Sequence, residues 1–294
     1  MQRRPFGSTG LQVPVLGFGA MQAGDPGLAD EDAARLLNHA LDRGLTLIDT
    51  ARAYGLSEER IGRHLARRRD EFVLSTKVGY GVDGIPDWTH DCVVAGVDAA
   101  RDRLRTDVID IVHLHSCGVE VLEAGGVVDA LEQCAAAGKL RAVAYSGDAA
   151  ALRYAIGCGA FGGVQASMNL CDQQARRPLA EARACGLGTI AKRPLAGRPW
   201  QPAASPADPV HAEYSRRFEA LRAEPGIEVD DWDDVALRLV AYEPGVDCVI
   251  VGGTRMVSLE RNLAAVAAGP LDASLLAAIR GAFDRVGTHW QGQV

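Results

Sequence analysis

Several polar side chains in this sequence follow directly after short apolar runs, and three of them carry groups used in acid–base chemistry. Asp49, Lys77 and His115 each close such a run, and Tyr54 follows Asp49 by five residues. A buried carboxylate and a buried ammonium group are costly to desolvate unless they pair, so Asp49 and Lys77 are predicted to form an ion pair. A nearby cation lowers the pKa of a tyrosine, which makes Tyr54 a competent proton donor.

Any one of these residues alone could equally have a structural role. Their occurrence together at the ends of apolar runs is what favours a functional site. His113 gives the contrast, because strand alternation places it on the same face as His115 but two residues deeper. We therefore expect His113 to be a buried, hydrogen-bonded histidine of the core. Asp49, Tyr54, Lys77 and His115 together indicate a site that donates a proton.

These side chains need a scaffold that brings the ends of several strands to one face, and the apolar pattern supplies it. Short β-rich runs alternate with stretches of helical spacing, such as 31–43, where Ala33, Leu36 and Leu37 share a face. Eight runs begin near Val15, Leu45, Phe72, Val108, Leu140, Val164, Thr189 and Cys248. Helices are predicted at 31–43, 57–69, 89–104, 123–138, 148–158, 173–186, 231–243 and 256–268.

This alternation predicts a parallel sheet closed into a (β/α)8 TIM barrel, as a single domain over residues 1–294. A doubly wound open sheet is the alternative, but the glycine fingerprint expected after its first strand is missing. Residues 3–14 predict an N-terminal β-hairpin, and 272–286 an extra C-terminal helix. The insertion 193–210 carries five prolines after the seventh strand, on the face where barrel active sites lie, and is a candidate lid.

Charge and composition argue against several classes of protein. The formal net charge is −7 with scattered basic residues, which indicates no nucleic-acid surface, and the arginines at 67–69 are expected to form the solvated end of a helix. No apolar stretch approaches the roughly 20 residues of a membrane span. Pro5 and Gly7 follow the Arg3-Arg4 pair where an export signal needs a continuous apolar region. The seven cysteines are dispersed without a C-x-x-C, which indicates neither disulfides nor a metal site and fits the cytoplasm.

Longer motifs run through most of the chain. The sequence contains RRPFGSTGLQVPVLGFGAM, LTLIDTARAYGLSEERIGRHLARRRDEFVLSTKVG, RDRLRTDVIDIVHLH, AYSGD, VQASMNL, GLGTIAKRPLAG and VIVGGTRMVSLERNL. In these motifs the chain strongly resembles the aldo-keto reductase family, of the bacterial NADP-dependent type. The D-T-A-x-x-Y-G stretch with the S-E that follows it and the S-T-K are highly specific in combination.

The resemblance implies a catalytic tetrad and a nicotinamide site. The tetrad falls on Asp49, Tyr54, Lys77 and His115, with Tyr54 as general acid in reduction and His115 orienting the carbonyl; His115 closes the motif D-x-x-x-x-H from Asp110. The implied contacts to the nicotinamide, the pyrophosphate and the adenosine are Ser146, Gln165, Asn169, Arg193, Pro194, Leu195, Gly197, Gly252, Thr254, Arg255, Ser258 and Asn262.

Some positions depart from the family's pattern. Gly147 stands where many members carry asparagine, and Gly252 and Gly253 stand where several NADPH-specific members carry lysine and serine. Arg255 is then the candidate partner of the 2′-phosphate, and NADPH is favoured over NADH. The residues expected to wall the substrate pocket, each of which could equally be packing, are Met21, Trp88, Cys117 and Trp290.

The resulting functional hypothesis is the NADPH-dependent reduction of an aldehyde or ketone, with a small carbonyl compound as substrate. One alternative is an NAD(P)-linked sugar or alcohol dehydrogenase that works in the opposite direction. A second alternative is a weakly catalytic nicotinamide-binding redox sensor, against which the intact tetrad argues. Neither the substrate nor the oligomeric state follows from the sequence.

Overall fold

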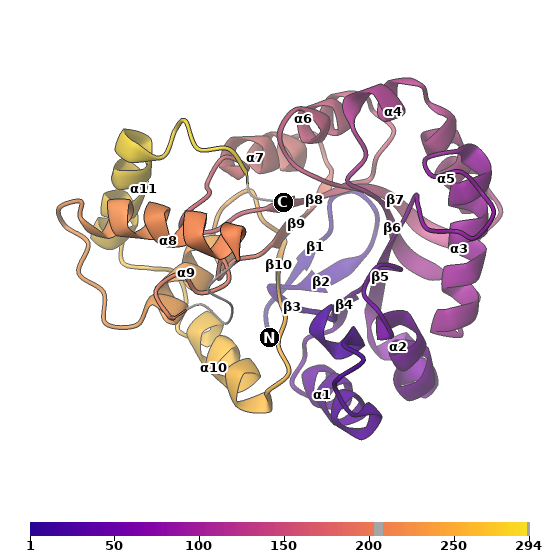
Figure 1. Ribbon diagram of the computed structural model, residues 1–294, viewed down its shortest axis with the longest axis horizontal. Coiled ribbons are helices and arrows are strands. Elements are labelled where there is room, and N and C mark those ends of the chain that lie inside the picture. Colours follow the sequence, from indigo (N-terminus) through magenta and orange to yellow (C-terminus); the bar gives the residue numbers. More distant parts are fainter. Residues whose placement is uncertain (203–207, 293–294) are drawn as a thin grey trace.

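The computed structural model describes residues 1–202 and 208–292. Its centre is a closed barrel of eight parallel strands, and the helices form an outer ring around it (Figure 1). The predicted (β/α)8 TIM barrel is therefore confirmed. Its strands, in their order around the barrel, are β10 (Cys248–Val251), β3 (Leu16–Gly19), β4 (Leu47–Asp49), β5 (Val73–Val78), β6 (Ile109–His115), β7 (Leu140–Ser146), β8 (Gly163–Ser167) and β9 (Gly188–Lys192).

Helices follow the strands, and most of them lie where the apolar pattern predicts them. Parallel strands need a crossover on the outside of the sheet, and amphipathic helices provide it here. The α-helices are α1 (Asp30–Asp42), α2 (Ser57–Leu65), α3 (His90–Leu104), α4 (Val119–Glu123), α5 (Gly126–Ala136), α6 (Ala149–Gly157), α7 (Arg176–Ala184), α8 (Pro209–Arg222), α9 (Trp232–Ala241), α10 (Met256–Ala267) and α11 (Ala273–Val286). The described part of the chain also contains two 3-10 helices, η1 (Gln22–Gly24) and η2 (Ala66–Glu71).

The predicted N-terminal hairpin is confirmed, and it closes the end of the barrel opposite to the strand ends that carry the polar residues. Strands β1 (Arg3–Pro5) and β2 (Gln12–Pro14) pair antiparallel. Phe6, in the turn between them, is fully buried among the inward side chains of the barrel. Its ring lies so close to Gly163 and Gly188 that an added Cβ there would come within 2.6 and 2.4 Å of it, so both positions require glycine.

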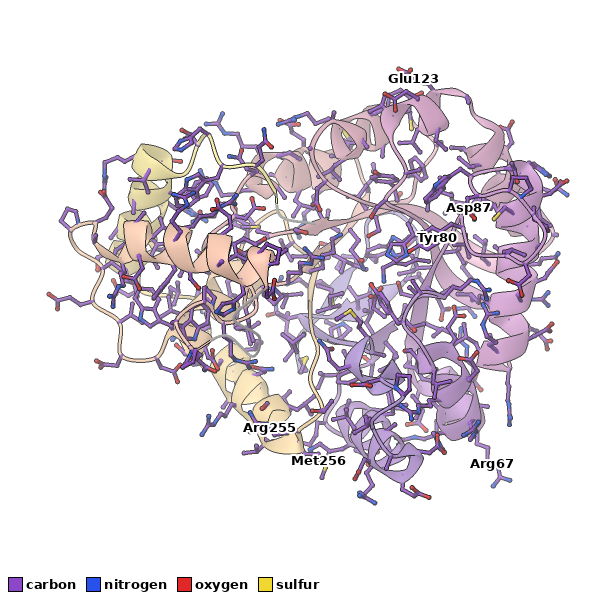
Figure 2. The ribbon with its side chains drawn as sticks, viewed as in Figure 1. Arg67, Tyr80, Asp87, Glu123, Arg255 and Met256 are labelled. Carbon is purple, nitrogen blue, oxygen red and sulfur yellow. The ribbon has the colours of Figure 1, made fainter. Side chains whose placement is uncertain are left out.

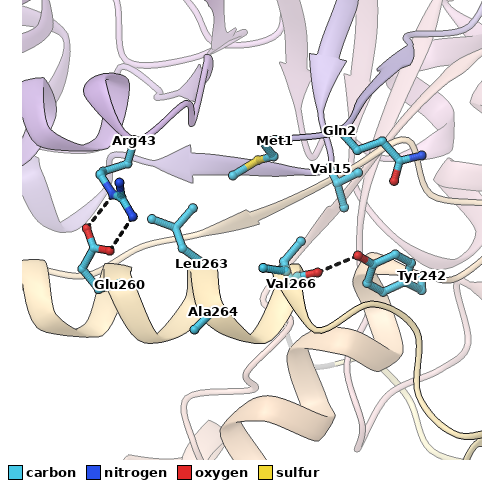
Figure 3. Close-up of a pocket in the computed structure, with 10 residues that line it drawn as sticks. Met1, Gln2, Val15, Arg43, Tyr242, Glu260, Leu263, Ala264 and Val266 are labelled. Carbon is cyan, nitrogen blue, oxygen red and sulfur yellow. Dashed lines mark hydrogen bonds and ion pairs between the residues drawn. The ribbon is translucent and has the colours of Figure 1, made fainter.

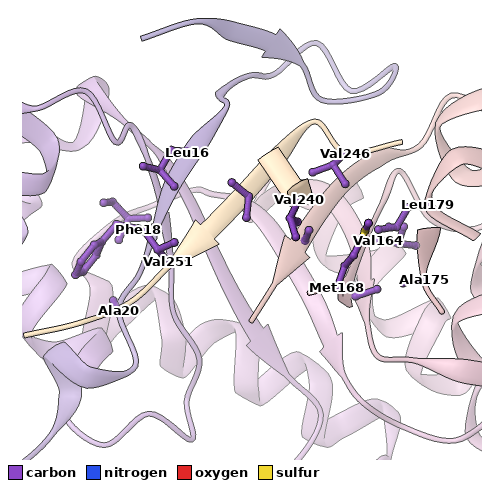
Figure 4. Close-up of a cluster of buried hydrophobic side chains, with 14 of the residues drawn as sticks. Leu16, Phe18, Ala20, Val164, Met168, Ala175, Leu179, Val240, Val246 and Val251 are labelled. Atoms are coloured by element: carbon purple, nitrogen blue, oxygen red, sulfur yellow. The ribbon is translucent and has the colours of Figure 1, made fainter. Parts of the chain in front are cut away.

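Apolar side chains on the outer face of the strands pack against the surrounding helices. Figure 4 shows Leu16 and Phe18 of β3 beside Val251 of β10, all part of one continuous buried cluster. The inner and outer faces are therefore both covered, as all-parallel sheets require. Among the described residues, no helix is both long and apolar enough to cross a membrane.

Four local predictions need correction. The helix predicted at 123–138 begins only at Gly126, as α5, and a short helix that was not predicted, α4, ends at Glu123 before it; Gly125, with a positive φ of 80°, separates the two. The helix predicted at 57–69 ends at Leu65, and η2 follows it. Of the three arginines in η2, which were expected to be solvated, only Arg67 is exposed and points out to solvent (Figure 2), whereas Arg69 donates to Asp110 at 2.6 Å.

The fourth correction concerns the insertion after β9. The sequence prediction treated 193–210 as a proline-rich lid, but its end begins helix α8, which was not predicted. Asp208 caps α8 by accepting hydrogen bonds from Val210 N and His211 N, and Pro209 occupies the first turn, where a missing N–H costs nothing. Residues 203–207 of the candidate lid lie outside the described residues.

Candidate active site

The predicted ion pair forms at the C-terminal end of the barrel. Lys77 Nζ donates to Asp49 Oδ2 at 2.6 Å and to the carbonyl oxygen of Thr50 at 2.8 Å. The side chains of Lys77 and Asp49 are only 1% and 2% exposed. Burial opposes the charge on each group, but mutual attraction outweighs it, so the pKa of Asp49 is lowered and that of Lys77 is raised. Both groups are therefore ionised at neutral pH.

The second oxygen of Asp49 is held by neutral donors on two other strands. Ser75 Oγ and Gln165 Nε2 each donate to Asp49 Oδ1 at 2.9 Å. Ser75 also hydrogen-bonds to Nε2 of His113 at 3.1 Å, and His113 is fully buried, as predicted. Burial lowers the pKa of His113 to about 4, so this imidazole is neutral. The carboxylate consequently has a fixed position and partners on both oxygens.

Tyr54 lies over this pair in the loop between β4 and α2. Lys77 Nζ is 4.9 Å from the centre of the Tyr54 ring, and a hydrogen bond with Tyr54 is among the causes that raise the pKa of Lys77. The backbone of Gly24 touches the loop, since a Cβ added to Gly24 would come within 1.8 Å of the Tyr54 carbonyl oxygen. Leu56 N donates to Gly24 O at 2.9 Å. Gly24 therefore holds the Tyr54 loop through its close contact with Tyr54 and its hydrogen bond from Leu56.

The remaining motif residues fasten α2 to the strands. Thr50 Oγ1 donates to Ser57 Oγ at 2.7 Å, and Ser57 Oγ donates to Ala20 O at 3.0 Å. Glu58 accepts from Thr76 Oγ1 at 2.5 Å, and Arg103 donates to its other oxygen at 2.7 Å. These contacts explain why D-T, S-E and S-T-K occur together, because they hold the loop that carries Tyr54.

His115, at the end of β6, contacts Tyr54 from two strands further round the barrel than β4. The two ring centres are 5.9 Å apart and nearly perpendicular, at 86°. Burial and the cation of Lys77 lower the pKa of His115 to about 3, so the imidazole is neutral at physiological pH. Tyr80, a residue that sequence reasoning missed, stacks on His115 and hydrogen-bonds to its Nδ1 at 3.0 Å. Its place three residues after Lys77, in the loop after β5, was the available signal.

A cavity of about 830 Å³ opens over these groups. Asp49, Tyr54 and His115 line it together with Tyr80, while Lys77 lies beneath. The residues implied by the family resemblance for the cofactor that line this cavity are Gln165, Arg193, Pro194, Leu195, Gly197 and Gly252. Others that line it were not predicted: Gln22, Lys192, Arg198, Asp208, His211 and Tyr214.

The other residues implied for the cofactor lie in two places. Ser146 and Asn169 are fully buried beside the cavity, where Ser146 Oγ donates to Gln165 Oε1 at 3.1 Å and Asn169 Oδ1 accepts from Cys171 N at 2.9 Å. Those after Gly252 lie around the start of α10, where Arg255 is exposed (Figure 2). This second group comprises Thr254, Arg255, Ser258 and Asn262.

The four predicted walls of the substrate pocket divide unevenly. Met21 lines the cavity and is 52% exposed, and Trp88 packs on Tyr80, which also lines it, with ring centres 5.4 Å apart. Cys117 is buried behind the site, where its carbonyl oxygen accepts from Tyr145. Trp290 is buried against Phe283 of α11. Trp88, Cys117 and Trp290 do not line the cavity, although Trp88 contacts it through Tyr80, so the prediction is corrected for these three.

Lys192, at the end of β9, adds a second ammonium group to the cavity. Its nearest carboxylate is that of Asp148, with Nζ 3.6 Å from Oδ2. Burial lowers the pKa of Lys192. Asp148 is itself held by Ser167, which donates to it from both N and Oγ at 2.7 and 3.0 Å. No role was predicted for this lysine from the sequence.

A separate cavity of about 490 Å³ lies between the N-terminus, α1 and α10 (Figure 3). Its charged groups, Arg43 and Glu260, pair with each other at 2.9 and 3.0 Å, and Tyr242 donates to the carbonyl oxygen of Val266 at 2.6 Å. No acid–base arrangement like that over Asp49 is present among the residues lining it. The catalytic chemistry therefore belongs to the larger cavity.

The open end of the barrel brings together a buried carboxylate–ammonium pair, a tyrosine and a neutral histidine. This arrangement is typical of an enzyme that carries out acid–base chemistry on a small molecule. The family model for the Aldo/keto reductase family matches residues 15–284. The chain belongs to this family and is an NAD(P)H-dependent oxidoreductase.

Individual relatives agree with this assignment. L-galactose dehydrogenase of Arabidopsis thaliana is 27% identical over 90% of this chain and 88% of its own. D-threo-aldose 1-dehydrogenase of a Pseudomonas species is 33% identical over 46% of this chain and 50% of its own. The solved structure of aldo-keto reductase AKR11C1 from Bacillus halodurans, in its holo form, shares the fold with a TM-score of 0.83 and 23% identity, covering 96% of each chain.

Proposed function

We propose that this enzyme uses NADPH to reduce an aldehyde or ketone to an alcohol, with Tyr54 as the proton donor. The observation that carries the proposal is the convergence of Asp49, Tyr54, Lys77 and His115 at one end of the barrel. We also propose that residues 1–294 form one domain and that the protein works in the cytoplasm, which its dispersed cysteines favour.

The residues around the cavity fit a nicotinamide dinucleotide. The loop after β9 turns back on itself through left-handed backbone at Arg193, Ala196, Gly197 and Arg198, and it brings two guanidinium groups to the cavity. Beyond Gly252, no side chain among the described residues caps the start of α10, so its first N–H groups stay open to an anion. Arg193 would face the pyrophosphate, with Arg198 beside it in an ion pair with Asp233 at 2.9 Å, and α10 would face the adenosine phosphate.

A bound NADPH supplies the hydride that reduces the carbonyl carbon. Tyr54 then gives its hydroxyl proton to the carbonyl oxygen, and the Lys77 cation beneath its ring stabilises the phenolate that remains. Asp49 holds Lys77 in place through its Oδ2. His115 faces the same space with Nε2, since Tyr80 occupies Nδ1, and it orients the carbonyl oxygen.

The preference for NADPH over NADH is proposed on the basis of Arg255. This residue precedes the first turn of α10 and its side chain is exposed, where a guanidinium can bind a phosphate through two hydrogen bonds. A side chain at Gly252 would be crowded, because a Cβ there would come within 2.9 Å of the backbone oxygen of Gly19. Arg255 is therefore the cation proposed to select the 2′-phosphate.

A second candidate is oxidation of an aldose or another alcohol by the same residues in the opposite direction. The names of two relatives, L-galactose dehydrogenase and D-threo-aldose 1-dehydrogenase, favour it. In that direction the Tyr54 phenolate accepts the proton of the hydroxyl group. Initial rates with NADP⁺ and a panel of aldoses, compared with NADPH and the matching carbonyl compounds, separate the two directions.

Replacing Tyr54 by phenylalanine tests the assigned proton donor. The variant keeps the ring over Lys77 but lacks the hydroxyl, so we expect carbonyl reduction to fall about 100-fold or more, since positioned proton donors contribute that much. NADPH binding, followed by fluorescence titration, should stay within about twofold, because the change is confined to one hydroxyl. Undiminished reduction by a variant that still binds NADPH contradicts the assignment.

A further inference from the structure

Tyr80 makes contacts with His115 that the proposed proton transfer does not use. The Tyr80 hydroxyl lies 3.0 Å from His115 Nδ1. The two rings stack with centres 5.4 Å apart and an angle of 26° between their planes. Tyr54 meets the same imidazole edge-on at 5.9 Å. His115 is therefore held between two tyrosines, of which only Tyr54 belongs to the tetrad.

The loop after β5 is built to hold Tyr80 in this place. Gly79 has a φ of +131°, and a Cβ added to it would come within 2.2 Å of the Trp88 ring, so only glycine fits. Trp88 itself takes a left-handed φ of 59°, and its N–H donates to Gly79 O at 2.7 Å. Its ring packs on Tyr80 with centres 5.4 Å apart. A strained conformation at Trp88 thus supports the tyrosine, as is common at functional sites.

Both partners in the Tyr80–His115 hydrogen bond are uncharged at neutral pH. Burial lowers the pKa of His115 to about 3, and burial raises the pKa of Tyr80 above its ordinary value. A neutral imidazole carries one N–H, so it donates from one nitrogen and accepts at the other. Whichever role Nδ1 takes toward Tyr80 therefore determines what Nε2 presents to the cavity.

We propose that Tyr80 is a positioning residue that fixes the tautomer of His115, its hydroxyl donating to Nδ1 so that the hydrogen stays on Nε2. This inference rests on the proposed function, because the group that Nε2–H addresses is the carbonyl oxygen of the substrate. The opposite arrangement would point a lone pair at that oxygen and leave the Tyr80 hydrogen without a use at this contact. Tyr80 acts through His115, in the way that the third member of a catalytic triad sets a histidine tautomer.

Nitrogen-15 NMR of histidine-labelled protein tests the tautomer without depending on turnover. Two-bond correlations distinguish a protonated from an unprotonated ring nitrogen, and a His115→Gln variant identifies the signals of His115. We expect the wild-type protein, with and without NADP⁺, to show hydrogen on Nε2 alone. Tyr80→Phe should show a mixture with hydrogen on Nδ1. Hydrogen on Nδ1 in the wild type, or an unchanged tautomer in Tyr80→Phe, overturns the proposal.

Steady-state kinetics give the second readout. We expect Tyr80→Phe to lower kcat about tenfold, the change that the loss of one hydrogen bond produces, with NADPH affinity within about twofold. Tyr242→Phe is the matched control, since its hydroxyl also donates one hydrogen bond, to Val266 O, but at the separate smaller cavity (Figure 3). It should change neither the tautomer nor kcat. If Tyr54→Phe keeps full activity while the tautomer result holds, the proposed function fails and the role of Tyr80 survives.

Discussion

Replacing Lys77 by methionine should destabilise the barrel strongly, because it leaves the Asp49 carboxylate buried without a cation. Methionine preserves an unbranched chain in the same space. The pair is joined at 2.6 Å with both side chains almost fully buried. Breaking such a pair on one side costs about 3–5 kcal/mol, a large part of the roughly 5–15 kcal/mol that stabilises a typical domain.

The destabilisation should depend on pH in a defined direction. In the wild type the pKa of Asp49 is lowered from 3.8, so its contribution is present above that value and is lost as pH falls through the folded pKa. In Lys77→Met the same carboxylate keeps its burial but loses its cation, so its pKa rises. The penalty should therefore be largest near pH 8 and should shrink as acid protonates Asp49.

Urea unfolding of the cofactor-free protein, followed by circular dichroism at several pH values, measures this effect. Arg285→Met is the control, since Arg285 is joined to Glu224 at the same 2.6 Å but is 52% exposed, and exposed pairs contribute about 0–1 kcal/mol. Adding Asp49→Asn to Lys77→Met should recover about 1–3 kcal/mol, because the buried charge is gone. Additive losses in the double variant, or a penalty that grows toward acid, would show that no buried, unpaired carboxylate causes the destabilisation.

Two further changes test the position of Tyr54 and the choice of cofactor. Gly24→Ala places a Cβ against the Tyr54 carbonyl oxygen, so carbonyl reduction should slow about 100-fold. The control is Gly126→Ala, whose added Cβ meets open space and should leave the rate unchanged. Equal rates in the two variants would show that Gly24 does not position Tyr54. Arg255→Gln should weaken NADPH binding about tenfold in a fluorescence titration and leave NADH binding unchanged, since one charged hydrogen-bond partner is lost. Equal weakening of NADPH and NADH binding would show that another residue binds the 2′-phosphate.

The fold could be predicted because it depends on repeated local patterns. Apolar runs of strand length alternate with helical spacing, and each strand-end residue, such as Asp49 or Lys77, is fixed to the mouth of the barrel once closure is accepted. Helix α8 was missed because the five prolines before it suggested an irregular segment, although Asp208-Pro209 is a helix start. Arg69 was predicted to be solvated because its partner, Asp110, lies far along the chain and the pairing cannot be seen from the local sequence.

The site was predictable only in part, because loop conformations decide which side chains reach the cavity. Tyr80 depends on the left-handed φ of Trp88 and the close approach at Gly79, and neither is visible in residue types alone. Trp290 was expected at the pocket because it lies in the tail, but it packs under α11 instead. Gln165 was expected to face the cofactor. Its side-chain amide also donates a hydrogen bond to Asp49 and accepts one from Ser146.

Hydride transfer from NADPH to a carbonyl carbon, proposed for the cavity over Tyr54, can be followed with an isotope label. The most direct test incubates the purified protein with NADPH that carries deuterium at both positions of the nicotinamide C4, together with a panel of aldehydes and ketones. Mass spectrometry then reads the label in the products. We expect an alcohol that carries one deuterium on the former carbonyl carbon, formed by the wild type and about 100-fold less by Tyr54→Phe. Unlabelled alcohol, or no alcohol from any compound by protein that binds NADPH, would contradict the proposed hydride transfer.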